Sequence, residues 1–125
     1  MKTGNAVQEK SYAFAVKAVL MCKGLMEEKK EFTLSRQLLR SGTAIGALVE
    51  EAIGAQSQKD FFAKLCISYK EARETKYWIR LLLDTGYLEK PQAADLLQDI
   101  EELLRIIGSI QKSIRLKMES SNRNS

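Results

Sequence analysis

The stretch Leu34-Ser-Arg-Gln-Leu-Leu-Arg-Ser-Gly-Thr-Ala-Ile-Gly-Ala-Leu-Val-Glu-Glu-Ala52 decides the fold of this chain. Its apolar residues recur at the spacing of one helical face, so it predicts a helix. Gly42 and Gly46 lie inside that helix, and each interior glycine costs about 0.5–1 kcal/mol relative to alanine. A helix with such residues usually packs closely against a neighbour. We therefore expect tight helix packing over the two glycines, and a binding groove over them is the alternative.

The composition of the whole chain favours a single all-α domain. The chain has 125 residues, of which 45% are hydrophobic and 29% charged, and it contains one proline. This length is typical of one domain that can bury its own core. The net charge of +4 permits binding to an acidic partner without requiring it.

No segment has the pattern of a targeting signal or a membrane span. The N-terminal residues lack an apolar run, and no stretch approaches the roughly 20 apolar residues that cross a bilayer. Cys22 and Cys66 fall in apolar helical patterns, which is typical of reduced, buried cysteines. We expect a cytoplasmic protein with no membrane contact.

Four helices are predicted, over residues 7–28, 34–53, about 58–84, and from Pro91 to about 119. Their boundaries rest on local signals: N-caps at Thr33 and Ser57, C-terminal stops at Gly54 and Gly86, and Pro91 in a first turn.

Short loops between long helices predict an antiparallel up-down-up-down four-helix bundle. We expect a single domain over residues 1–119 and a disordered tail over residues 120–125. An assembly of long helical hairpins is the alternative.

The first helix carries apolar residues on two faces. One stripe, which we predict to face the core, is Tyr12, Ala15, Val19, Cys22 and Met26. The second stripe, on nearly the opposite face, is Phe14, Ala18, Met21 and Leu25. Because a helix in a four-helix bundle is not central, we predict that the second stripe is an oligomer interface. A scatter of exposed apolar residues is the alternative.

The residues that usually carry catalysis are largely absent from the sequence. The chain has no histidine, which removes the commonest general base and metal ligand. Its two cysteines are too few for a structural zinc site, and it has no glycine-rich phosphate loop. We predict no catalytic residue, no metal and no cofactor. A carboxylate-based metal enzyme that uses Glu50, Glu51, Glu71 and Glu74 is a distant alternative to ion pairs with basic residues.

Basic residues gather toward one predicted end of the bundle, where acidic neighbours dilute them. They are Lys10, Lys59, Lys64, Lys112, Arg115 and Lys117. As contacts to phosphates, they would bind RNA or DNA in a salt-dependent and largely sequence-independent way. A solvated surface with no binding role is the alternative.

Several motifs together resemble a known family. They are Leu38-Leu-Arg-Ser-Gly-Thr-Ala-Ile-Gly-Ala47, Glu50-Glu-Ala52, Ser57-x-x-Asp60-Phe, Lys70-Glu-Ala-Arg-Glu-Thr-x-Tyr-Trp78 and Leu81-Leu-Leu83. They resemble the bacterial four-helix bundle family whose members include proteins encoded in intervening sequences of large-subunit ribosomal RNA genes. The accessory variability determinant of diversity-generating retroelements is related to it.

The resemblance implies an antiparallel bundle that assembles as a ring-like homopentamer without catalytic activity. From the retroelement relatives it implies binding to nucleic acid and to a protein partner such as a reverse transcriptase. It also implies a structural polar network at Arg40, Glu51, Glu71 and Glu74. The chain has Ala44 and Leu48 where the family often has Ser and Asn, which puts any polar contact made there in question.

The sequence therefore favours a non-enzymatic, oligomeric four-helix bundle. Its expected role is accessory nucleic-acid binding through sequence-independent backbone contacts. A protein–protein interaction scaffold with no nucleic-acid role is the alternative.

Overall fold

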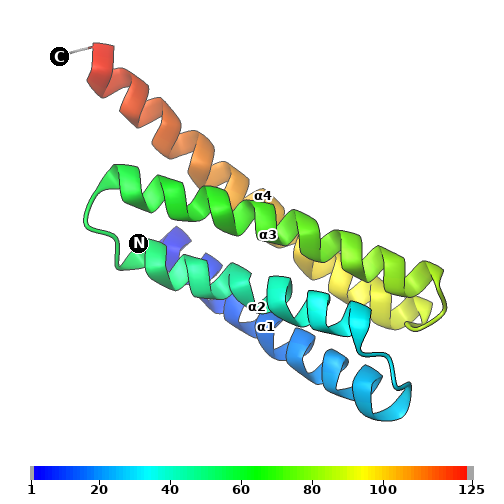
Figure 1. The fold of residues 1–125 in the computed structure, drawn as a ribbon. Helices are drawn as coiled ribbons and strands as arrows, with labels where there is room; N and C mark the ends of the chain where they lie inside the picture. The colour runs from blue at the N-terminus through cyan, green and yellow to red at the C-terminus, as the bar shows by residue number, and fades with distance from the viewer. Residues whose placement is uncertain (1, 124–125) are drawn as a thin grey trace.

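The computed structural model describes residues 2–123, and this range folds into four α-helices. They are α1 (Lys2–Glu28), α2 (Thr33–Ile53), α3 (Gln58–Asp84) and α4 (Lys90–Arg123). Each helix runs back along the one before it, and short loops connect them (Figure 1). The predicted all-α four-helix bundle is confirmed.

Contacts between neighbouring helices define the antiparallel order. Along α2 and α3, Arg40 contacts Glu71 while the later Glu51 contacts the earlier Lys64. Along α1 and α4, Lys10 contacts Glu102 and Lys17 contacts Asp95. The largest side chains in the shared core are Phe14, Leu38, Ile45, Leu65, Ile79, Leu82, Leu96, Ile100, Leu103 and Ile107.

The two glycines of α2 lie directly against α1. A Cβ atom added at Gly42 would lie 3.1 Å from the Cβ of Ala18 and 3.5 Å from the ring of Phe14. One added at Gly46 would lie 3.3 Å from the backbone oxygen of Ser11. The glycines therefore allow close packing between α1 and α2, as predicted, and α1 covers the place where the alternative put a groove.

The faces of α1 are largely the reverse of the prediction, although Cys22 of the predicted core stripe is buried as expected. Phe14, Ala18 and Leu25 lie in the core, with Phe14 only 1% exposed, so they cannot form an exposed interface in this chain. Met21 is half-buried. Tyr12 and Val19, predicted to face the core, are 70% and 43% exposed. The reason is tertiary: the close approach to α2 selects the face that fits against its glycines.

The start of α2 uses a cap that differs from the predicted one. Thr33 is already helical, and Phe32 in the N-cap position forms no side-chain cap bond. The buried Glu31 instead accepts hydrogen bonds from the backbone N–H groups of Leu34 (2.9 Å) and Ser35 (2.7 Å) and from the Ser35 hydroxyl (2.8 Å). Burial alone would raise the pKa of Glu31, but these donors hold it below its usual value.

The other boundaries follow local signals more closely. The Ser57 hydroxyl accepts from the Asp60 N–H at 3.0 Å, and Gly86 adopts φ +84° after the end of α3. Gly54 follows the last residue of α2, and Pro91 lies in the first turn of α4.

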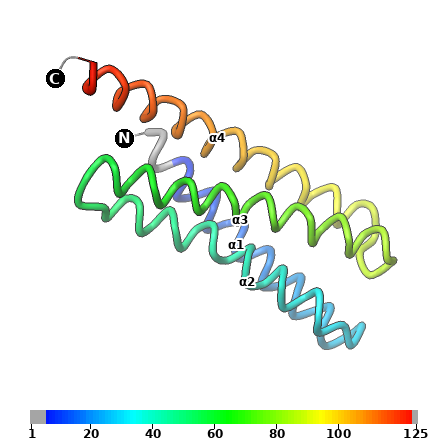
Figure 2. Tube along the Cα trace, turned by 45° about the horizontal axis from the view of Figure 1, so that its top comes forward, coloured from blue at the N-terminus to red at the C-terminus, as the bar shows by residue number. Residues whose placement is uncertain are grey.

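Both terminal helices are longer than expected. Helix α1 begins at Lys2 rather than at Val7, and α4 continues to Arg123. The predicted disordered tail is therefore wrong for residues 120–123, and residues 124–125 lie outside the described range. The C-terminal turns of α4 diverge from the other helices (Figures 1 and 2).

Candidate functional site

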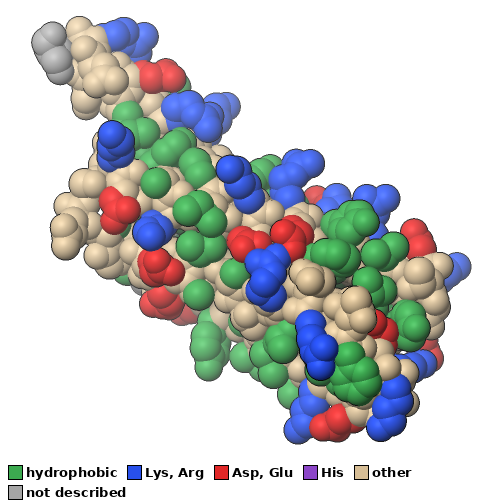
Figure 3. Space-filling view, in the orientation of Figure 1, with side chains coloured by type: hydrophobic (Ala, Val, Ile, Leu, Met, Phe, Trp, Pro, Cys, Tyr) green, Lys and Arg blue, Asp and Glu red, His purple; other side chains and the backbone are tan. Residues whose placement is uncertain are grey.

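The diverging end of α4 carries the exposed part of the predicted basic cluster. Lys112, Arg115 and Lys117 are exposed there, and Lys and Arg side chains lie over this end of the molecule (Figure 3). The guanidinium of Arg115 lies 5.6 Å from the centre of the Phe62 ring on α3. This contact aligns the end of α4 with the start of α3, where Lys59 is also exposed. These four cations form the surface that we call the basic end.

The other two predicted members are in ion pairs. The ammonium group of Lys10 lies 3.0 Å from Glu102, and that of Lys64 lies 3.1 Å from Glu51. Glu102 precedes Lys112 by roughly 15 Å along α4 at the helical rise per residue. Lys10 is therefore distant from the basic end, and Lys64 is partly neutralised beside it. Sequence reasoning missed this because both partners are supplied by other helices.

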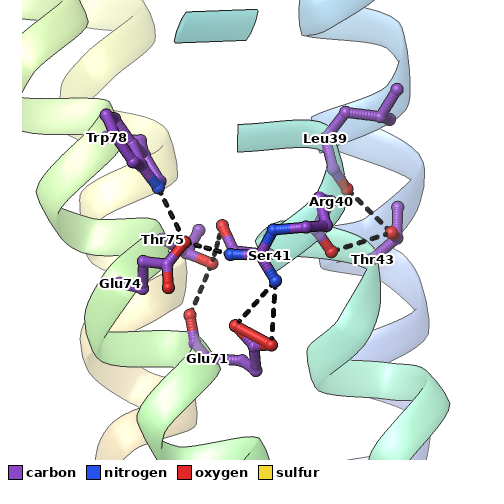
Figure 4. Close-up of polar contacts among 8 residues, drawn as sticks. All are labelled: Leu39, Arg40, Ser41, Thr43, Glu71, Glu74, Thr75 and Trp78. Carbon is purple, nitrogen blue, oxygen red and sulfur yellow. Dashed lines mark hydrogen bonds and ion pairs between the residues drawn. The ribbon is translucent and has the colours of Figure 1, made fainter. Parts of the chain in front are cut away.

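A polar network joins α2 to α3 near the middle of the bundle (Figure 4). Arg40 donates to Glu71 at 3.1 and 3.3 Å and also contacts Glu74. The indole N–H of Trp78 donates to Glu74 at 3.0 Å. Glu51 is not in this network, since it pairs with Lys64 instead.

The opposite charges of Arg40 and Glu74 favour each other's ionised forms. The hydrogen bond from Trp78, followed by the contacts with Arg40, holds the pKa of Glu74 below its usual value. The contacts with Glu71 and then with Glu74 raise the pKa of Arg40. Beneath them, the buried Thr75 hydroxyl hydrogen-bonds to Ser41 at 2.9 Å. The arrangement fixes the α2–α3 contact and the side chain of Trp78, which the sequence analysis had not placed in the network.

The outer face of α1 is an exposed apolar surface next to an open groove. Tyr12, Val16, Val19 and Leu20 have the spacing of one helical face and are each at least 43% exposed. Toward the end of this face, a groove of about 400 Å³ runs between α1 and α4, lined by residues that include Leu20, Met21, Gly24, Leu88 and Leu96. Lys17 lies beside it and bridges Asp95 and Asp99 at 3.1 and 2.7 Å. The spacing of this face was visible in the sequence, although its exposure was not.

The acidic side chains and Cys22 lie in separate surroundings within residues 2–123. Among residues that the structure describes, no group of three or more Cys, Asp or Glu side chains is placed to hold a metal ion. Glu50 accepts a hydrogen bond from Gln8 rather than joining Glu71 and Glu74. The Cys22 thiol is buried, and burial followed by the nearby Glu31 raises its pKa to about 12. None of the helices within residues 2–123 is long and apolar enough to span a bilayer.

The fold and its surfaces define a helical-bundle protein with a polar network between α2 and α3 and a basic end. Residues 4–109 match the family model of the 23S rRNA-intervening sequence proteins, and the chain belongs to this family. It is similar to the crystal structure of a protein of unknown function from the S23 ribosomal protein family of Bacteroides thetaiotaomicron VPI-5482. The identity is 46% and the TM-score 0.87, with 88% of this chain and 98% of that chain covered. A comparison with curated proteins finds no match.

Proposed function

We propose that this chain is a non-enzymatic accessory protein of the cytoplasm that binds RNA or DNA through the phosphate backbone. The observation that carries the proposal is the basic end. Lys59, Lys112, Arg115 and Lys117 are exposed there, and no ion pair joins any of them to a carboxylate among the described residues. Cations without a carboxylate partner can contact phosphates and release counterions.

The proposal is tested by anisotropy of labelled single-stranded RNA and of duplex DNA, at low and at near-physiological salt. The variant Lys112→Glu/Arg115→Glu/Lys117→Glu reverses the basic end. A control of equal charge, Lys23→Glu/Lys29→Glu/Lys90→Glu, reverses exposed lysines at the opposite end of the bundle. We expect the first variant to lose binding and to reduce the salt slope by roughly three, whereas the control retains most of both.

Two outcomes would contradict the proposal. If both variants weaken binding equally, only net charge matters and the basic end is not a site. If the unaltered protein fails to bind either nucleic acid at low salt, nucleic-acid binding is wrong and the scaffold function takes its place.

A second candidate function, self-association as an interaction scaffold, is favoured by the outer face of α1. Large exposed apolar patches are typical of interfaces, and Tyr12, Val16, Val19 and Leu20 provide one here. The family resemblance supports a homopentamer, with a reverse transcriptase as one kind of further partner. A ring would also repeat the basic end and strengthen nucleic-acid binding through avidity.

Self-association is tested by light scattering after size-exclusion chromatography. The variant Val16→Glu/Leu20→Glu should reduce an oligomer to the monomer without unfolding it, because both side chains are exposed in the single chain. Gln37→Glu/Ala47→Glu, which adds the same charge at exposed positions of α2, is the control. A monomeric unaltered protein, or an unchanged mass for the α1 variant, would exclude this interface.

A further inference from the structure

The outer surface of α3 carries a second row of cations, with a tyrosine among them. Lys70, Arg73, Tyr77 and Arg80 follow one another at three- and four-residue steps, and all four are exposed. This places them on a single helical face, away from the core. The side chain of Tyr77 is 53% exposed. Among the described residues, no ion pair engages Lys70, Arg73 or Arg80. We call this row the α3 stripe.

The tyrosine of the α3 stripe is supported from below by the polar network. The rings of Tyr77 and Trp78 meet edge to face, with centres 5.0 Å apart and planes at 75°. Trp78 is in turn fixed by its hydrogen bond to Glu74, which contacts Arg40 on α2. A ring held in this way loses little conformational freedom when a ligand stacks on it. The network therefore holds an exposed aromatic side chain in place.

The cations are distributed on both sides of the ring. Arg73 and Arg80 lie roughly 10 Å apart along the helix axis, with Tyr77 between them. Neighbouring carboxylates on the α2 side, Glu71 and Glu74, are already engaged by Arg40. The aromatic ring of Tyr77 is therefore flanked by positive charge. Proteins bind single-stranded nucleic acid with this combination, because bases stack on aromatic rings while cations contact phosphates.

An exposed aromatic residue elsewhere lacks this setting. The guanidinium of Arg36 lies 5.7 Å from the centre of the Phe32 ring, which is 42% exposed. That ring follows the carboxylate of Glu31 in the chain, and the lysines before it, Lys29 and Lys30, lie in the loop between α1 and α2 rather than on one helical face with it. An aromatic side chain beside one arginine therefore also occurs outside the α3 stripe. What distinguishes the stripe is that cations on the same helical face lie on both sides of the ring.

We infer that the α3 stripe binds single-stranded nucleic acid, with a base stacked on Tyr77 and phosphates held by Lys70, Arg73 and Arg80. A base inside a duplex is covered on both faces by its neighbours, so only an unpaired strand can use the ring. An acidic peptide would match the charge but offers no base to stack. The inference rests on the proposed function and adds a second contact surface, distinct from the basic end.

The first test compares anisotropy of a short unstructured RNA with that of the same sequence as a duplex. Tyr77→Ala should weaken single-strand binding roughly 10- to 100-fold and leave duplex binding unchanged. Tyr77→Phe, which keeps the ring, should bind like the unaltered protein. Phe32→Ala removes an exposed aromatic side chain outside the stripe and should have no effect. Circular dichroism during heating checks that each variant remains folded.

The second test uses the tryptophan beside the ring as a local probe. Trp78 is the one tryptophan of the chain, so its emission reports on the α3 stripe and not on the basic end. Unlabelled RNA should change this emission in the unaltered protein and in Lys112→Glu/Arg115→Glu/Lys117→Glu at concentrations high enough to bind. The change should be lost in Arg73→Glu/Arg80→Glu.

The outcomes separate this inference from the proposed function. If the unaltered protein binds RNA but Tyr77→Ala binds as tightly and Trp78 does not respond, the inference is wrong and the proposed function stands. If Tyr77→Ala weakens duplex binding as much as single-strand binding, or if polyglutamate displaces RNA from the stripe as effectively as unlabelled RNA, stacking is wrong. If no nucleic acid binds, both fail.

Discussion

The two faces of α1 are both apolar, yet one is buried in the core and the other is exposed. The inner face, with Phe14, Ala18 and Leu25, is buried, and Phe14 and Ala18 lie against Gly42 of α2. The outer face, with Tyr12 and Leu20, is as apolar and has the same periodicity, yet it remains exposed in the single chain. Periodicity identifies a helix and its stripes, but the fit to a neighbouring helix decides which stripe forms the core.

The largest difference is expected when an aromatic ring is removed from each face. Phe14→Ala should lower the free energy of unfolding by about 3–5 kcal/mol, because it leaves a cavity in the core. Tyr12→Ala should change it by no more than about 0.5 kcal/mol, since its side chain is mostly exposed. Urea denaturation of dilute protein, followed by circular dichroism, measures both. Equal losses would mean that the two faces are not distinguished as the structure indicates.

The next largest loss of stability is expected at Glu31, in the loop between α1 and α2. Glu31→Ala removes three hydrogen bonds at the start of α2. We expect a loss of about 1–2 kcal/mol at neutral pH, as for other helix caps. Thr33→Ala, at the position that the sequence suggested as the cap, is the control and should cost much less. Urea denaturation of both variants decides which residue caps the helix.

The same carboxylate predicts a dependence on pH. Because the pKa of folded Glu31 is lowered from its ordinary 4.5, the ionised group stabilises the fold above that value. This stabilisation is lost as the pH falls through the folded pKa. The difference in unfolding free energy between the unaltered protein and Glu31→Gln should thus be largest near neutral pH and should shrink below pH 4.5. A constant difference across this range would contradict the assigned cap.

A smaller effect is expected at the glycine that contacts the inner face. In Gly42→Ala the new methyl group would lie 3.1 Å from the Cβ of Ala18, which cannot rotate away. Overpacking costs about 1–3 kcal/mol, and the improved helix propensity offsets up to about 1 kcal/mol of it. We expect a net loss of about 1 kcal/mol in thermal or urea unfolding. A gain in stability would show that α1 and α2 can separate at little cost.

The smallest effect is expected at Gly24, on α1 beside the groove. A Cβ atom added there meets nothing within 4 Å. Gly24→Ala should therefore raise the free energy of unfolding by about 0.5–1 kcal/mol, through helix propensity alone. Opposite signs for Gly42→Ala and Gly24→Ala would establish, in matched substitutions, that only one of these glycines is required for packing. Destabilisation by Gly24→Ala would point instead to an occupied groove.

Local sequence signals predicted the boundaries that depend on adjacent residues. Ser57 and Gly86 act through neighbours in the chain, so the start and end of α3 were predictable. The cap of α2 was missed because the long side chain of Glu31 reaches the helix from outside the usual N-cap position. The extension of α4 was missed because the polar residues at its end resemble a tail.

The candidate sites depended more on tertiary structure. Ion pairs across helices neutralise Lys10 and Lys64, and no pattern within one helix could have indicated them. The proximity of Arg40, Glu71 and Glu74 was implied by family resemblance rather than by spacing. The stacking role that we propose for Tyr77 was not apparent, because an aromatic residue in a helix usually belongs to a core. Its exposure and its contact with Trp78 come from the structure.

The contacts between α1 and α4, which we call the α1–α4 seam, have a consequence for the order in which the protein folds. They join segments near the two ends of the chain, since Lys17 and Asp99 are 82 residues apart in sequence. Contacts of such separation carry a high closure entropy and form late. We expect the α2–α3 hairpin to form early and the α1–α4 seam to close last. Native-state hydrogen exchange should then find that amides of α1 open before those of α2 and α3.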